Sequence, residues 1–189
     1  MIIFGVTGTD GAGKGTLVKY LVETYGFVHH SSRELILEEI TRQGLTPDRS
    51  TMRTVANEMR AKYGNAVIVT TALNKASINK QSRIIIESIR ALAEVEALRA
   101  ESGILLAVDA DPRVRYERIR RRQSSSDQVT YDEFLAHEEL EKNDPDPHGM
   151  QKGAVMAAAD YTVFNTRSIK DLQRETDAVM AKLGITKQN

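Results

Sequence analysis

The sequence predicts an α/β fold in which a five-stranded parallel sheet carries helices on both faces. Short β-branched apolar runs alternate with helical segments along the whole chain, which is the pattern of a parallel sheet covered on both sides. One run, Arg83-Ile84-Ile85-Ile86-Glu87, is apolar throughout its centre, as expected for a strand buried on both faces. A glycine-rich turn also joins the first apolar run to the first helical segment. With 189 residues and 41% hydrophobic content, the chain can form one compact domain.

Each element has its own signal. Strands are expected at residues 2–6, 27–30, 83–87, 104–108 and 161–164. Helices are expected over residues 14–25, 31–43, 48–62, 66–75, 91–100 and 111–122, with two more that begin near residues 130 and 168. Ser31-Ser32-Arg33-Glu34 and Thr130-Tyr131-Asp132-Glu133 have the form of capping boxes, and Asp111-Pro112 places a cap before a proline at the first helical position. Residues 124–127 and 143–149 are rich in turn formers and are expected to be loops.

Composition restricts the kind of partner. Lys+Arg and Asp+Glu are balanced at 26 each, so no global charge attracts nucleic acid or an anionic membrane. Cysteine is absent, which excludes disulfides and thiolate sites and fits a cytoplasmic protein. No apolar run approaches the roughly 18–20 residues that span a bilayer, and the N-terminus lacks the basic region of a signal peptide. We therefore expect no membrane and no nucleic-acid partner.

Residues 8–16 carry the clearest chemical signal. Gly8-Thr9-Asp10-Gly11-Ala12-Gly13-Lys14-Gly15-Thr16 has the G-x-x-x-x-G-K spacing, follows a strand and opens a helix. Glycines let successive main-chain N–H groups converge on one anion, and the helix N-terminus adds partial positive charge. Lys14 can then reach the β- and γ-phosphates of ATP as a compact cation. The residues expected to bind ATP are Gly8, Asp10, Gly11, Ala12, Gly13, Lys14, Gly15 and Thr16.

The Gly13-Lys14-Gly15-Thr16 form resembles the loop of adenylate kinase and related nucleoside-monophosphate kinases. Ser31-Ser32-Arg33-Glu34 stands where these kinases open their acceptor-binding helices, and Ile86-Glu87-Ser88-Ile89-Arg90 resembles the segment whose arginine holds the acceptor phosphate. Arg118-x-x-x-Arg122 resembles their lid arginines, and Ala159 to Asn165 is similar to a late strand of dephospho-CoA kinases. The chain as a whole looks like nucleotide kinases related to both enzymes.

The resemblance implies a single P-loop kinase domain over residues 1–189. Residues 31–80 are then a small helical insertion that binds the acceptor, and about 119–150 form the lid. Two departures concern the acceptor. Leu37 occupies the position of a phosphate-binding arginine, which Arg33 can replace, and Glu87 stands in place of an aspartate. The stretch from Asp10 to Lys14 also resembles thymidylate kinase loops, in which the aspartate contacts the acceptor nucleotide.

Roles follow from the resemblance and from charge. Arginine forks suit phosphate oxygens, and a carboxylate at a strand end suits Mg²⁺ held through water. The expected catalytic residues are Lys14, Arg90, Arg118 and Arg122. The expected substrate-binding residues are Ser31, Ser32, Arg33, Arg60, Glu87 and Arg90. Mg²⁺ is assigned to Thr16 and Glu87.

Structural roles compete with several of these assignments. Arg90 can simply pair with Glu87 or Glu94, and Glu87 can cap the following helix. Ser31 is already explained as a helix cap, and Arg60 can lie on a solvated surface. The cations from residue 118 to 122 can complement a helix C-terminus.

The combined expectation is an ATP- and Mg²⁺-dependent phosphotransferase acting on a nucleoside monophosphate or a similar nucleotide. A dephospho-CoA kinase-like activity and a non-kinase ATPase adapter with a kinase fold are the alternatives. No Asn-Lys-x-Asp sequence for guanine is present, which argues against a GTPase switch.

Overall fold

The computed structural model describes residues 1–121, 129–142 and 150–188. Within them, five parallel strands form one sheet in the order β2-β3-β1-β4-β5. The strands are β1 (Ile2–Gly8), β2 (Val28–Ser31), β3 (Arg83–Glu87), β4 (Ile104–Asp109) and β5 (Tyr161–Phe164). The predicted parallel sheet is confirmed, because β1 pairs with β3 on one side and β4 on the other.

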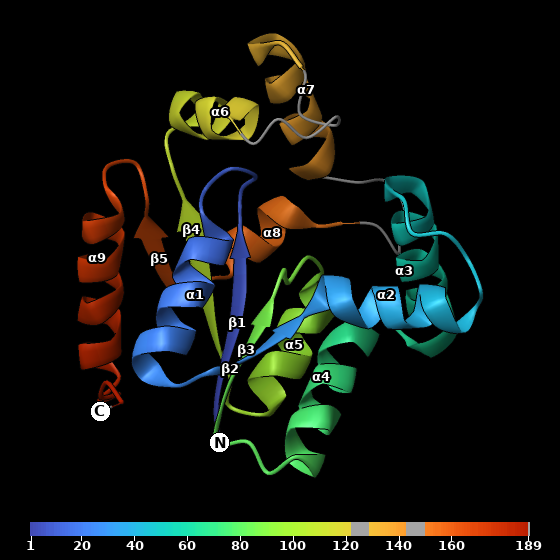
Figure 1. The fold of residues 1–189 in the computed structure, drawn as a ribbon, viewed down its shortest axis with the longest axis horizontal. Coiled ribbons are helices and arrows are strands. Elements are labelled where there is room, and N and C mark those ends of the chain that lie inside the picture. The colour runs from blue at the N-terminus through green and yellow to red at the C-terminus, as the bar shows by residue number, and fades with distance from the viewer. Residues whose placement is uncertain (122–128, 143–149, 189) are drawn as a thin grey trace.

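Helices cover both faces of the sheet (Figure 1). They are α1 (Lys14–Tyr25), α2 (Ser32–Arg42), α3 (Arg49–Tyr63), α4 (Val67–Ile78), α5 (Leu92–Ala100), α6 (Pro112–Arg121), α7 (Tyr131–Lys142), α8 (Lys152–Ala157) and α9 (Ile169–Lys182). Among the described residues, no helix has both the length and the apolarity needed to cross a bilayer.

Two apolar cores, one on each face, hold the three layers together. On the first face, side chains of α1 and α9 pack against alternate strand residues such as Phe4, Ile85 and Leu106. On the second face, side chains of α2, α3, α4, α5 and α8 pack against the intervening residues, among them Ile84 and Ile86. The three isoleucines of β3 are each 0% exposed, as the unbroken apolar run predicts.

Several predicted helix starts are confirmed in atomic detail. Ser31 accepts a hydrogen bond from the Glu34 amide at 3.4 Å, and Asp48 accepts one from the Thr51 amide at 2.8 Å. At the start of α9, Ser168 and Asp171 make both halves of a capping box. These caps satisfy amides that have no partner within their own helices.

Boundaries differ from the prediction at a few places. Strand β2 runs one residue further along the chain, to Ser31, and α4 continues three residues further, to Ile78. Helix α8 was not predicted, because six residues are too few to show a helical period. The predicted loops at 124–127 and 143–149 lie outside the described residues.

Helices α6 and α7 lie beyond the carboxyl ends of the strands, and α2 and α3 project to one side of the sheet (Figure 1). These four helices thus lie around one end of the sheet. This end is where open α/β sheets bind their ligands.

Candidate phosphate-binding site

The loop between β1 and α1 has the shape that its glycines allow. Gly8, Gly11 and Gly13 have φ values of 153°, 78° and 99°. A Cβ at Gly8 would lie 2.3 Å from the Val108 carbonyl oxygen, and one at Gly13 would lie 2.3 Å from Asn165 Nδ2. No other residue would fit these positions without displacing its neighbours.

Lys14 is the first residue of α1, and its side chain reaches back to this loop. Its ammonium group donates to the carbonyl oxygens of Gly8 at 2.9 Å and Thr9 at 3.0 Å, and it lies 3.8 Å from Asp10 Oδ1. Burial lowers the pKa of Lys14 to about 8, and the nearby cations Lys152 and Arg90 act in the same direction. A partly dehydrated cation with cationic neighbours is suited to bind a polyanion.

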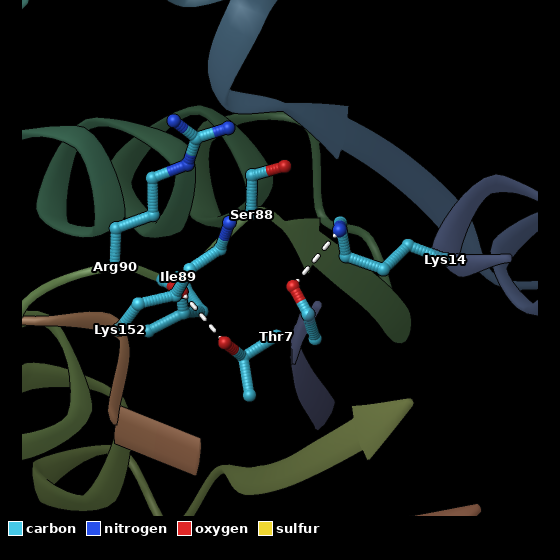
Figure 2. Close-up of a pocket in the computed structure, with 7 residues that line it drawn as sticks. Thr7, Lys14, Ser88, Ile89, Arg90 and Lys152 are labelled. Atoms are coloured by element: carbon cyan, nitrogen blue, oxygen red, sulfur yellow. Dashed lines mark hydrogen bonds between the residues drawn. The ribbon is translucent and has the colours of Figure 1, made fainter. Parts of the chain in front are cut away.

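A pocket opens beside Lys14 (Figure 2). It is lined by Thr7, Gly8, Lys14, Ser88, Ile89, Arg90 and Lys152. Lys14 enters from α1 on one side, and Ser88 and Arg90 come from the segment after β3 on the other. The sequence-predicted residues Lys14 and Arg90 therefore line one pocket.

The turn after β3 is held in an uncommon conformation. Ser88 has φ of 68°, the left-handed region that non-glycine residues rarely adopt. The turn is fixed to β1 by two hydrogen bonds, from the Ile89 amide to the Val6 carbonyl at 3.0 Å and from the Thr7 hydroxyl to the Ile89 carbonyl at 2.9 Å. Strain kept by surrounding contacts is frequent at functional sites.

Arg90 and Glu94 are linked through the main chain. Glu94 Oε2 accepts from the amides of Arg90 at 2.7 Å and Ala91 at 3.1 Å, and the Arg90 guanidinium lies 3.1 Å from Met150 Sδ. The alternative pairing of Arg90 with Glu94 thus takes place at the backbone, while the guanidinium remains at the pocket.

Arg60 is buried rather than solvated. It is 6% exposed, and its Nη2 lies 3.8 Å from Glu94 Oε1. Burial raises the pKa of Glu94, although the adjacent Arg60 opposes that shift. Arg60 thereby supports the carboxylate that fixes the start of α5.

Glu87 ends β3 beside the phosphate loop. His29 Nε2 lies 2.9 Å from Glu87 Oε2, and this contact lowers the pKa of Glu87 in spite of its partial burial. Ser32 donates to the Glu87 carbonyl oxygen. The amides at the start of α5 bond to Glu94, so the capping role considered for Glu87 belongs to Glu94.

The other predicted site residues are more scattered. Ser31 caps α2, Arg33 is exposed on that helix, and Gly15 is exposed on the first turn of α1. Arg118 lies on α6, where burial lowers its pKa and where its Nη1 has no hydrogen-bond partner among the described residues. Arg122 lies outside the described residues.

Lys152, on α8, was missed from the sequence. Its side chain is 10% exposed, and its Nζ donates to Asp10 Oδ1 at 3.1 Å. Although burial favours the neutral acid, Lys152 and Lys14 together lower the pKa of Asp10 to about 2. The 150–157 segment has no periodic pattern that could have revealed this lysine.

Asn165 was also missed as a support of the loop. The residue is 5% exposed, and its Nδ2 donates to the Ala12 carbonyl oxygen at 2.7 Å. Thr9 provides a second support, because its hydroxyl donates to Asp109 Oδ1 at 2.7 Å. Asp109 ends β4 and Asn165 directly follows β5, so both lie where the carboxyl ends of these strands meet.

A nucleotide with Mg²⁺ fits the donor set of this site. The glycine loop and the N-terminus of α1 present main-chain amides, and Lys14 adds an ammonium group. Mg²⁺ usually takes one or two protein oxygens, phosphate oxygens and water, which the Thr16 hydroxyl and the Glu87 carboxylate can complement. Among the described residues, no group of three or more His, Asp or Glu side chains could hold a metal ion.

Comparison with known proteins identifies the family. A family model described as an AAA domain matches residues 5–144. A UPF0200 protein of Pyrococcus horikoshii is 31% identical over 189 residues, which cover 97% of this chain and 97% of that protein.

Solved structures agree on the fold. Shikimate kinase from Bacteroides thetaiotaomicron aligns with a TM-score of 0.60 at 16% identity, covering 97% of this chain and 98% of that one. Dephospho-CoA kinase from Campylobacter jejuni aligns with a TM-score of 0.57 at 16% identity, covering 96% of each chain. The chain belongs to the AAA-domain family, is a relative of the UPF0200 proteins and has the P-loop kinase fold.

Proposed function

We propose that this chain is a phosphotransferase that moves the γ-phosphate of ATP to a nucleoside monophosphate or a similar nucleotide. The observation that carries the proposal is the shared pocket of Lys14 and Arg90, which enter it from opposite sides. Phosphoryl transfer needs mainly positioning and charge neutralisation, and these two cations supply both.

We assign each group a binding role from its position in the site. The amides of residues 11–16 and Lys14 hold the β- and γ-phosphates of ATP. Arg90 faces them from the turn after β3 and binds the acceptor. Thr16 and Glu87 are the residues proposed to hold Mg²⁺, which would neutralise the negative charge that develops on the phosphate oxygens.

In the transfer, an acceptor oxygen forms a bond to the γ-phosphorus while the bond from that phosphorus to the β–γ bridging oxygen breaks. ADP leaves with the bridging electron pair, which Lys14 stabilises. A nucleoside monophosphate attacks through a phosphate oxygen that carries no proton near pH 7. A hydroxyl acceptor must lose a proton.

The experiment offers the purified protein ATP and Mg²⁺ with a panel of nucleoside monophosphates and dephospho-CoA. We expect ADP and a phosphorylated nucleotide to appear together. Formation of phosphorylated dephospho-CoA would select the CoA-precursor alternative instead. ADP without a phosphorylated acceptor would favour the ATPase adapter, and no ADP above background would refute the proposal.

Arg90→Ala separates the two halves of the site. We expect it to raise the KM for the acceptor at least tenfold while the Kd for ADP stays within about twofold, because Arg90 is assigned to the acceptor. An equal loss of ADP affinity would show that Arg90 belongs to the ATP side.

A further inference from the structure

Arg115 is a buried cation with no role in the site described so far. It lies on α6, and its side chain is only 5% exposed. Its Nε donates to the Ala110 carbonyl oxygen at 2.8 Å, and its Nη1 donates to the Asp10 carbonyl oxygen at 3.3 Å. A guanidinium group of α6 thus contacts the main chain of the phosphate loop.

The backbone of Arg115 also packs against that loop. A Cβ at Gly11 would lie 2.6 Å from the Arg115 carbonyl oxygen, so only glycine allows these two backbone segments to approach this closely. Arg115 therefore touches the outer turn of the loop, residues 9–11, with both its side chain and its backbone.

The counter-charge of Arg115 comes from a different helix. Glu138 of α7 accepts from both terminal nitrogens of Arg115, with 2.8 Å between Nη2 and Oε2. Asp109 Oδ1 is more distant, at 3.8 Å from Nε. A bidentate arginine–carboxylate pair fixes orientation as well as distance. Phe134, also of α7, lies with its ring centroid 5.3 Å from the guanidinium carbon.

These contacts form a continuous connection from α7 to the loop. A buried guanidinium that loses its partner carries an uncompensated charge, which favours its rotation toward water. Rotation of Arg115 would remove its hydrogen bond to Asp10 and loosen residues 9–11. The loop would then have to be ordered during nucleotide binding, and that ordering lowers affinity.

We propose that Arg115 is a positioning residue that couples the docking of α7, through Glu138, to the shape of the phosphate loop. The proposal rests on the proposed function, because it assumes that the loop binds nucleotide phosphates. Coupling of this kind is reciprocal, so a nucleotide on the loop also holds α7 more firmly.

Glu138→Gln tests the coupling, and Glu139→Gln is its matched control. Glu139 is the next residue on the same helix, is exposed and pairs only locally with Lys142 among the described contacts. The Kd for ADP is measured by calorimetry. Hydrogen exchange is measured at residues 9–12 and 131–142, with and without ADP. We expect Glu138→Gln to raise the Kd about tenfold, within the usual range of coupling between sites.

Exchange distinguishes positioning from general stability. In Glu138→Gln, residues 9–12 should exchange faster, and ADP should no longer protect α7, while strands β1, β3 and β4 exchange as in the control. Identical Kd and exchange in the two variants would overturn the proposal. Faster exchange spread over the three strands would also overturn it, because Glu138 would then only stabilise the fold.

Arg115→Lys tests the same coupling independently. Lysine keeps the charge but cannot contact Glu138 bidentately while reaching Asp10, so it should reproduce the loss seen with Glu138→Gln. The variant that carries both substitutions should have the same Kd for ADP as either single variant, because each substitution breaks the same connection between α7 and the loop. Additive increases in Kd would contradict this. If the unaltered protein binds no ADP, the proposed function fails, whereas the ligand-free exchange comparison still decides the coupling.

Discussion

The phosphate loop and the proposed acceptor side are built by different means. Residues 8–16 form a loop whose main-chain amides we propose to bind phosphate, and its glycines have conformations that other residues avoid. The proposed acceptor side, which we define as Arg60, Glu87, Arg90 and Glu94, is built from long charged side chains on α3, β3, α5 and the turn between β3 and α5. A site made of main-chain groups is determined by a short contiguous segment of sequence, whereas a site made of side chains depends on how elements distant in the sequence pack together.

The largest effect should follow from removing the loop's cation. Lys14→Ala should lower turnover about a thousandfold, because the transferred and leaving phosphates lose their main positive charge. Steady-state ADP formation measures this. Lys19→Ala, which removes an exposed lysine of the same helix, is the control and should change little. Near-normal turnover in Lys14→Ala would mean that the loop is not the phosphate site.

A substitution on the proposed acceptor side should mainly lower the stability of the fold. Glu94→Ala leaves Arg60 buried without its carboxylate and frees the amides of Arg90 and Ala91, so it should lower the free energy of unfolding by about 3 kcal/mol. Urea denaturation compares it with Glu96→Ala on the exposed side of α5. Equal stability of the two variants would contradict a buried supporting role for Glu94.

Two glycines of the loop should behave in opposite ways. Gly13→Ala forces a left-handed alanine against Asn165 and should destabilise the protein by about 1–3 kcal/mol. A Cβ at Gly15 would have no neighbour within 4 Å among the described residues, and Gly15 lies in α1, so Gly15→Ala should stabilise the protein by about 0.5–1 kcal/mol. Thermal unfolding of both variants measures these changes in stability. Changes of the same sign in the two variants would refute the conformational argument.

A further prediction concerns the dependence of nucleotide affinity on pH. Burial holds the pKa of Lys14 near 8, so the protonated form that attracts phosphate is present below this pH and is lost above it. The affinity for ADP, measured in EDTA, should be constant near pH 7 and should approach a tenfold fall per pH unit above about pH 8. Lys14→Arg retains its charge throughout, and its profile should be flat. A flat profile in the unaltered protein would show that Lys14 stays protonated.

The comparison also explains how much could be predicted from the sequence. The five strands, their parallel arrangement and the loop geometry were predictable, because apolar runs and glycine spacing are local signals. The resemblance of residues 86–90 to a kinase segment pointed to Arg90, which does line the pocket beside Lys14. The assignment of chemical roles to these residues stays a prediction.

Other parts of the site had no local signal. Lys152 lies on a six-residue helix, and its contact with Asp10 joins positions 142 residues apart. Arg115 belongs to a basic run in which the sequence favoured Arg118 and Arg122, yet its burial depends on Glu138 from the next helix. Such pairs become visible only when helices are packed against the loop.

A crystal structure with ADP tests the central claim most directly. The account predicts that the β-phosphate lies within about 3 Å of Lys14 Nζ and of the main-chain nitrogens between Gly11 and Thr16. ADP bound elsewhere, or bound with its phosphates turned away from these nitrogens, would contradict it.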